Sequence, residues 1–312
     1  MNENIKQYAP VLIPTLNRIK HLSRLLESLS KCPEAKETEL IIGLDYPPSE
    51  RYVDGWEKIK EYLPNVTGFK KVTVIESNHN LGCIENLARL KDYFLTTAYN
   101  SVIITEDDNE FSPNFLTFMN WGLDKYKDDE NVLAICGYNY PIDMSEYGKE
   151  YYFSHEFSAW GYGMTRTNLS FIRDNILKLS YIDTLVHSPL SLLKLTCKSG
   201  WRLSRQAIDY HRKREVHGDG YLTYFNYTED KYCLFPKVSK VRNWGHDGSG
   251  AHCVDLKGDD LFLSQQFDNS IAFRADDKVL VKDNKRVNKE LRSYFKYNSL
   301  LIKEHLKKII GR

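Results

Sequence analysis

The sequence predicts an α/β protein in which a mostly parallel central sheet is flanked by helices. Short apolar, β-branched runs alternate with longer amphipathic segments through the first half of the chain, as they do in βαβ units. Each run is continuously apolar, which is typical of strands covered on both faces. The length of 312 residues suits one large domain with additions.

Five of these runs are expected to be strands: Val11–Pro14, Leu40–Leu44, Val72–Ile75, Val102–Thr105 and Val132–Ile135. Arg18–Leu29 repeats leucine at helical spacing and Gly82–Phe94 keeps apolar residues on one face, so both are expected to be crossover helices. A further helix is expected to begin near Ser112 and Pro113, because serine caps helices and proline suits a first helical turn.

The pattern changes after about residue 137. Aromatic and glycine-bearing segments follow, and they predict an antiparallel edge with long loops. Residues 281–312 form a basic amphipathic segment that is expected to be a helical tail. The predicted organisation is therefore one domain over 1–280, with halves at about 9–137 and 138–280, and a C-terminal tail over 281–312.

The composition is that of an ordinary soluble protein and restricts the class of partner. The 43 basic and 42 acidic residues give a formal net charge of +1, so the chain as a whole has no strong positive field that would attract nucleic acid. The six cysteines form no CxxC pair and no zinc-ligand spacing. The first residues lack the apolar core of a signal peptide, and no later run is long enough to span a membrane. A cytoplasmic protein with reduced thiols is expected.

The most informative residues are the three acids at 106–108, which directly follow the fourth expected strand. Ligands of open α/β sheets bind at the carboxyl ends of strands. Adjacent carboxylates repel one another unless a cation or hydrogen-bond donors compensate them, and Mn²⁺ or Mg²⁺ would do so. A solvated turn or a helix cap also explains acids at this position. A Walker B site is excluded because the chain has no GxxxxGK[ST] loop. Asp108 is therefore the predicted metal ligand.

Short motifs also follow the other expected strands. Pro14-Thr-Leu-Asn-Arg18 follows the first, Asp45 the second, Asn78-His-Asn-Leu-Gly82 the third and Glu106-Asp107-Asp108 the fourth. With these motifs in this order, the chain resembles bacterial glycosyltransferases of the GT-A fold, and is similar to family 2 and to enzymes of the N-acetylglucosaminyltransferase I type. The resemblance covers roughly residues 9–280. It implies a Rossmann-like GT-A domain with an acceptor-side extension.

The resemblance implies that a nucleoside diphosphate sugar, with uridine favoured, binds along these strand ends. The implied donor-binding residues are Pro14, Thr15, Arg18, Asp45, Asn80, Gly82, Glu106 and Asp107. Asp45 is equally well explained as a turn residue, and Asn80 almost as well as a helix cap.

Matches in the second half suggest the remaining roles. Trp160-Gly161-Tyr162 is similar to the segment that lines the sugar and the acceptor, since aromatic faces stack on pyranose rings, although core packing also explains it. Asp219 is the implied general base. Asp209 is its reserve, because Gly218 stands where the family usually has tryptophan. His252 is the implied second metal ligand.

The implied function is inverting, metal-dependent transfer of a sugar to a hydroxyl of a glycan or lipid-linked acceptor in surface polysaccharide synthesis. Two alternatives stay open at this point: a sugar nucleotidylyltransferase, although its glycine-rich loop is absent, and a non-catalytic nucleotide-sugar-binding or scaffold protein. For the basic tail, peripheral contact with the inner face of the membrane, dimer formation and packing on the domain all remain open.

Overall fold

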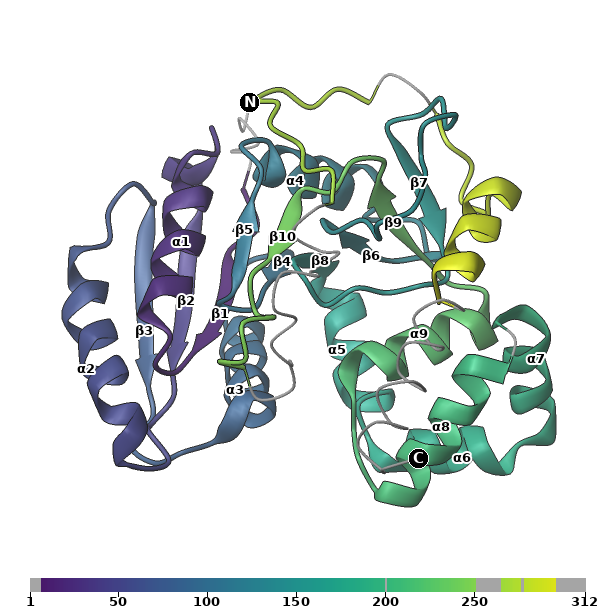
Figure 1. Ribbon diagram of the computed structural model, residues 1–312, viewed down its shortest axis with the longest axis horizontal. Helices are drawn as coiled ribbons and strands as arrows, with labels where there is room; N and C mark the ends of the chain where they lie inside the picture. Colours follow the sequence, from purple (N-terminus) through teal and green to yellow (C-terminus); the bar gives the residue numbers. More distant parts are fainter. Residues whose placement is uncertain (1–6, 200, 251–264, 276–277, 296–312) are drawn as a thin grey trace.

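The computed structural model describes residues 7–199, 201–250, 265–275 and 278–295 (Figure 1). Its strands are β1 (Val11–Thr15), β2 (Glu39–Leu44), β3 (Lys71–Glu76), β4 (Ser101–Ile104), β5 (Asn109–Phe111), β6 (Val132–Cys136), β7 (Tyr151–Ser154), β8 (Tyr162–Thr165), β9 (Tyr232–Pro236) and β10 (Val241–Asn243). Its α-helices are α1 (Ile19–Ser30), α2 (Val53–Tyr62), α3 (Gly82–Thr96), α4 (Phe115–Lys125), α5 (Arg166–Asn175), α6 (Leu179–His187), α7 (Pro189–Ser199), α8 (Trp201–Lys213) and α9 (Gly218–Glu229).

Eight of the strands form one sheet in the order β3-β2-β1-β4-β8-β6-β9-β7. The pairs among β3, β2, β1 and β4 are parallel, as is the pair of β6 with β9, whereas β8 and β7 run antiparallel to their neighbours. β5 and β10 form a separate antiparallel ribbon. The predicted α/β class, with a sheet flanked by helices, is confirmed. Because strands from both predicted halves share this sheet, the two halves form one continuous structure.

The period of two along the strands divides the core into two layers. In β1, Leu12 packs with α3 on one face of the sheet, while Val11 and Ile13 pack with the leucines of α1 on the other. Helix α4 covers the same face as α1, and helices α5 to α9 lie on the face of α3. This double covering explains why the strand runs are continuously apolar.

All five expected strands and both expected crossover helices occur, with ends that differ by one or two residues. One expectation was wrong at β3, which is an edge strand with no fully buried residue and is not covered on both faces. The further helix expected near Ser112 and Pro113 also occurs, but Ser112 is not its cap. Helix α4 begins at Phe115 after Asn114, and Ser112 instead donates its hydroxyl hydrogen to Asn114 Oδ1 at 2.9 Å.

Helices α5 to α9 were not predicted as a group. They gather beside the β6, β9 and β7 end of the sheet (Figure 1) and bury Leu169, Ile182, Leu195 and Leu203. The spacing of Leu203, Ala207 and Tyr210 in α8 is helical and was the available signal for this part of the fold.

Part of the predicted tail belongs to the core. Residues 285–295 are helical, Val287 and Leu291 are buried, and Phe295 packs on Tyr140 with ring centroids 5.2 Å apart. The remainder of the tail, residues 296–312, lies outside the described residues. In the described part of the chain, no helix combines the length and the apolar character needed to cross a membrane.

Lys91 of α3 is a buried charge that opposes folding. It is 9% exposed, makes no hydrogen bond or ion pair with the described residues, and burial lowers its pKa to about 8. Below that pH, Lys91 stays charged inside the protein, which destabilises it. We therefore expect Lys91→Met to raise the free energy of unfolding at pH 7, by about 1–3 kcal/mol.

The pH dependence provides a second check on Lys91. Between pH 8 and the higher pKa of the unfolded chain, the unfolded state binds a proton that the native state lacks, so wild-type stability rises with pH. The advantage of Lys91→Met in urea unfolding should therefore shrink over that interval. The control is Lys20→Met, at an exposed position in α1. An equal gain from both variants would refute the burial argument.

Candidate functional site

Two of the three carboxylates that follow β4 are buried. Asp107 and Asp108 are 5% and 6% exposed, whereas Glu106 is exposed to solvent. A buried carboxylate is destabilising unless donors or a cation compensate its charge. The partners of Asp107 and Asp108 therefore decide what this strand end can bind.

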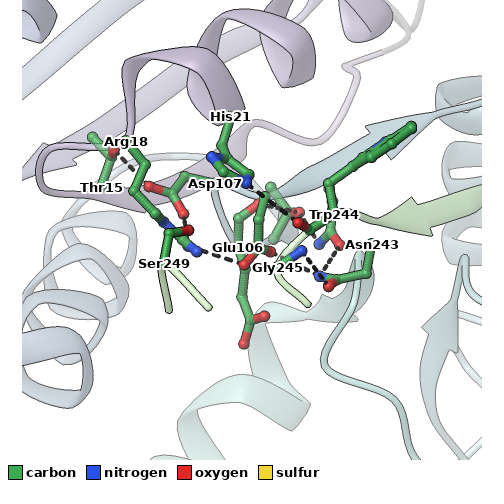
Figure 2. A network of polar contacts seen from close by, with 12 residues as sticks. Thr15, Arg18, His21, Glu106, Asp107, Asn243, Trp244, Gly245 and Ser249 are labelled. Carbon is green, nitrogen blue, oxygen red and sulfur yellow. Dashed lines mark hydrogen bonds and ion pairs between the residues drawn. The ribbon is translucent and has the colours of Figure 1, made fainter. Parts of the chain in front are cut away.

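Asp107 is held by residues at the end of β1, which pairs in parallel with β4. Thr15 Oγ1 donates to Asp107 Oδ2 at 2.9 Å, and Arg18 forms an ion pair with Asp107 (Figure 2). The same Arg18 Nη2 lies 3.0 Å from Asp108 Oδ2, so one guanidinium relieves the repulsion between the two carboxylates. Burial still keeps the pKa of Asp107 above its ordinary value, because the charge of Arg18 offsets only part of the desolvation.

Asp108 is held from the opposite side by the end of β10. Asn243 Nδ2 donates to Asp108 Oδ1 at 2.8 Å, and Trp244 N donates to the Asp108 carbonyl oxygen at 2.8 Å. Gly245 N in turn donates to Asn243 Oδ1 at 2.9 Å, which fixes the orientation of the amide. Figure 2 shows these residues approaching the strand end opposite Thr15 and Arg18. Three segments far apart in the sequence therefore meet on one carboxylate pair.

Gly245 leaves no room for a side chain beside Asp108. A Cβ on Gly245 would lie 2.4 Å from Asp108 Oδ2. We therefore expect Gly245→Ala to displace the carboxylate, to reduce stability by about 1–3 kcal/mol and to reduce any activity that depends on Asp108. Thermal unfolding measures the loss of stability, and an activity assay measures the loss of activity. Gly148→Ala is the matched control, because a Cβ there meets nothing within 4 Å. Equal behaviour of the two variants would contradict the expected clash.

Asp108 is the carboxylate at this strand end that the sequence predicts to bind a divalent ion. No group of three His, Cys, Asp or Glu side chains that could hold a metal occurs among the described residues. Mg²⁺ and similar hard ions often bind through one or two carboxylates and take their other ligands from water and substrate phosphates. Asp108 fits such an ion, which would share Oδ2 with Arg18. The second predicted ligand, His252, lies outside the described residues.

Glu106 is the free carboxylate of the cluster. It makes no hydrogen bond or ion pair with the part of the chain that the structure describes. Desolvation by the surrounding protein and the charges of Asp108 and Asp107 raise its pKa to about 8, although water reaches the same side chain and screens part of this effect. Asp219 is among the charges that act on Glu106. Asp219 therefore lies within electrostatic reach of the acidic strand end.

Asp219 lies in the first turn of α9 and is exposed. Its Oδ1 accepts a hydrogen bond from Gly220 N at 2.8 Å, which orients the carboxylate. The reserve candidate, Asp209, is exposed on α8, and no contact of the described residues joins it to the acidic strand end. Of the two predicted bases, the structure thus brings Asp219 toward Glu106.

The segment 160–162 enters the sheet directly beside the acidic residues. Tyr162 at the start of β8 pairs with Ile104 at the end of β4. Gly161 has a φ of +68°, and a Cβ there would meet Val241 at 3.0 Å, so the turn into β8 requires glycine. The backbone of this segment therefore adjoins the end of β4.

The two aromatic side chains of this segment differ in accessibility. Tyr162 is buried and packs edge to face on Phe157, and burial together with the charge of Glu106 raises its pKa. Trp160 is partly exposed and packs edge to face on Tyr138 with ring centroids 4.6 Å apart. Of the two, Trp160 is the ring that a ligand can reach.

Asp45 holds the loop that precedes α3. It is buried and accepts hydrogen bonds from Tyr46 N, Leu81 N and Gly82 N at 2.8–2.9 Å and from Asn80 Nδ2 at 3.1 Å. The carboxylate thus satisfies N–H groups at the start of α3, where a helix favours negative charge. Asn80 does not cap α3 itself. The loop around Asn80 and Gly82 is therefore fixed against β2, and Pro14 lies in the adjacent strand β1.

The side-chain contacts that hold Trp244 in place were not predicted from the sequence. Arg24 lies over the Trp244 ring at 4.2 Å, and Trp244 Nε1 donates to Glu110 at 2.8 Å. His21 Nε2 lies 3.3 Å from the Trp244 carbonyl oxygen and 3.2 Å from Asp247. The Asn-Trp-Gly run was visible in the sequence, but its partners on α1 lie more than two hundred positions away and left no local signal.

No protein-family model and no curated protein matches this chain. Among solved structures, S. aureus TarS 1–349 is 18% identical with a TM-score of 0.37, covering 55% of this chain and 49% of that chain. TarS 1–349 in complex with UDP-GlcNAc is 17% identical with a TM-score of 0.38, over 55% and 48%. The mannosyltransferase PcManGT from Pyrobaculum calidifontis, in complex with GDP-Man and Mn²⁺, is 13% identical with a TM-score of 0.41, over 72% and 70%. The chain spans about half the length of the TarS chain.

Proposed function

We propose that this protein is a glycosyltransferase that moves a sugar from a nucleoside diphosphate sugar, with UDP the first candidate, to a hydroxyl of a glycan or lipid-linked acceptor. One observation carries the proposal: the ends of β1, β4 and β10 converge on Asp107 and Asp108 at the carboxyl edge of the sheet. Ligands of open α/β sheets bind at that edge.

The donor diphosphate is assigned to the side of Arg18 and Asp108. Arg18 Nη1 is buried and lacks a hydrogen-bond partner, so an oxygen of a bound diphosphate would satisfy it. A divalent ion on Asp108 would supply stabilisation of the charge that develops on the leaving diphosphate. The fixed loop at Asn80 and Gly82 lines the nucleoside in this proposal, and Trp160 offers an aromatic face to the sugar.

Asp219 is the proposed general base of a single displacement with inversion. Its carboxylate takes the proton of the acceptor hydroxyl while the acceptor oxygen bonds to the anomeric carbon. The bond from that carbon to the diphosphate oxygen breaks, and the nucleoside diphosphate leaves with the electron pair. The exposure of Asp219 in the first turn of α9 supports access by an acceptor.

A panel of nucleoside diphosphate sugars, each incubated with the protein in Mn²⁺ or in EDTA, tests the proposal. We expect slow hydrolysis of one donor in Mn²⁺. The same donor should be consumed faster when a hydroxyl acceptor is present. A non-catalytic binding protein would raise the unfolding temperature with a donor but release no nucleoside diphosphate. A nucleotidylyltransferase would instead consume a sugar 1-phosphate with a nucleoside triphosphate and release pyrophosphate. Either of those results would overturn the proposal.

A further inference from the structure

Helix α7 exposes apolar side chains to solvent. Leu190 and Leu193 are 65% and 59% exposed and lie three residues apart, so they project from one side of the helix. Among the described residues, no other two large exposed apolar side chains lie within one helical turn of each other. Isolated exposed leucines are common, whereas two adjacent ones form a small apolar patch on the surface.

The chain around α7 concentrates positive charge. Residues 178–214 contain eight Lys or Arg and two Asp or Glu, a formal net charge of +6, although the whole chain carries only +1. Lys194 is exposed next to Leu193. This stretch is thus more basic than the chain as a whole, although Lys198, Arg202 and Arg214 already form ion pairs with carboxylates.

The basic helix 285–295 lies against the same region. Arg292 Nη2 donates to the Lys198 carbonyl oxygen at 3.1 Å, at the carboxyl end of α7. Lys285, Lys289 and Arg292 line a cavity of about 520 Å³ together with Asn288 and Ser293. Figure 1 shows this helix beside α9 and near the end of α7. Three cations and no acid among the described lining residues make the cavity suited to an anion.

We propose that α7 and the helix 285–295 dock this protein on an anionic phospholipid surface. Leu190 and Leu193 enter the interfacial layer, while Lys285, Lys289 and Arg292 contact lipid phosphates. No residue of the acidic strand end takes part in this surface, so loss of docking and loss of the proposed catalysis can be observed separately. Charge complementarity selects the membrane over a second copy of the chain, because two copies of this surface would repel each other.

Sedimentation with lipid vesicles tests the docking. The full chain is mixed with vesicles of phosphatidylcholine alone or of phosphatidylcholine and phosphatidylglycerol in equal amounts. We expect binding to the anionic vesicles, weak binding to the neutral ones, and about a tenfold or larger loss for Leu190→Glu with Leu193→Glu. Lys285→Gln with Lys289→Gln should also weaken binding and reduce its dependence on salt.

Ile84→Glu is the matched control for Leu190→Glu, because Ile84 is 64% exposed on α3, outside the proposed surface. Unchanged unfolding temperatures would show that the variants fold. Equal binding by wild type and Leu190→Glu, or equal binding to neutral and anionic vesicles, would overturn the proposal. So would a wild-type dimer that becomes monomeric in the leucine variants without any vesicle binding, since α7 would then join two copies of the chain.

Discussion

Asp108→Asn is expected to reduce sugar transfer by about 10³-fold or more in kcat/KM while the protein stays folded. Removing a charge that holds a Lewis-acidic ion costs several kcal/mol of transition-state stabilisation, and each 1.36 kcal/mol is a factor of ten. The amide keeps an oxygen that can accept from Asn243, so the local packing is preserved better than in Asp108→Ala. Donor turnover and Mn²⁺ binding by calorimetry measure the effect.

Asp124→Asn serves as the control for Asp108→Asn, because Asp124 is an exposed carboxylate of α4 that pairs with Lys127 at the surface. It should transfer sugar at the wild-type rate. Asp108→Ala should lose activity and also lose stability, since Asn243 Nδ2 and Arg18 Nη2 would each lose one of their partners. Wild-type turnover in Asp108→Asn would remove the role proposed for this carboxylate.

Asp219→Asn is expected to lower kcat by about 10²–10⁴-fold with little change in the KM of the donor. General-base assistance contributes a factor of this size, and Asp219 is assigned to the acceptor and not to the diphosphate. Because Asp219 is exposed, the substitution should leave the unfolding temperature nearly unchanged. Steady-state kinetics with a fixed acceptor and varied donor separate kcat from KM.

Asp209→Asn shows which of the two predicted bases, Asp219 or Asp209, takes the proton. If the large loss of kcat appears in Asp209→Asn while Asp219→Asn turns over normally, the base must be reassigned to α8. A loss in which the donor KM rises and kcat is retained would instead place Asp219 in donor binding. The charge of Asp219 acts on Glu106, which favours Asp219 as the base over either alternative.

The positions of the strands followed closely from the sequence because hydrophobic pattern is a local property. Val11–Thr15 and Glu39–Leu44 are apolar runs whose neighbours are amphipathic, and burial on both faces requires that pattern. The leucines of α1 behave in the same way, since their spacing alone defines the buried stripe. Helices α5 to α9 were not expected from the sequence, although the spacing of apolar residues in α8 is helical.

The partners of the site residues did not follow from the sequence. Arg18 was expected to bind the donor, and the structure pairs it with Asp107 and Asp108. Asp45 was expected to bind the donor as well, and its carboxylate accepts hydrogen bonds from the loop before α3. Tyr162 was expected beside the sugar, and its ring is buried against Phe157. Their roles toward a ligand stay predictions.

The sequence by itself determined the α/β class, the order of the first strands and helices, and the placement of three carboxylates after a buried strand. Only the tertiary structure decided which groups compensate those carboxylates: Arg18 from the end of β1 and Asn243 from the end of β10. The reason is physical. Apolar periodicity is written into neighbouring residues, whereas a buried charge must be satisfied by whichever donors the packed chain brings near it, at any distance in sequence.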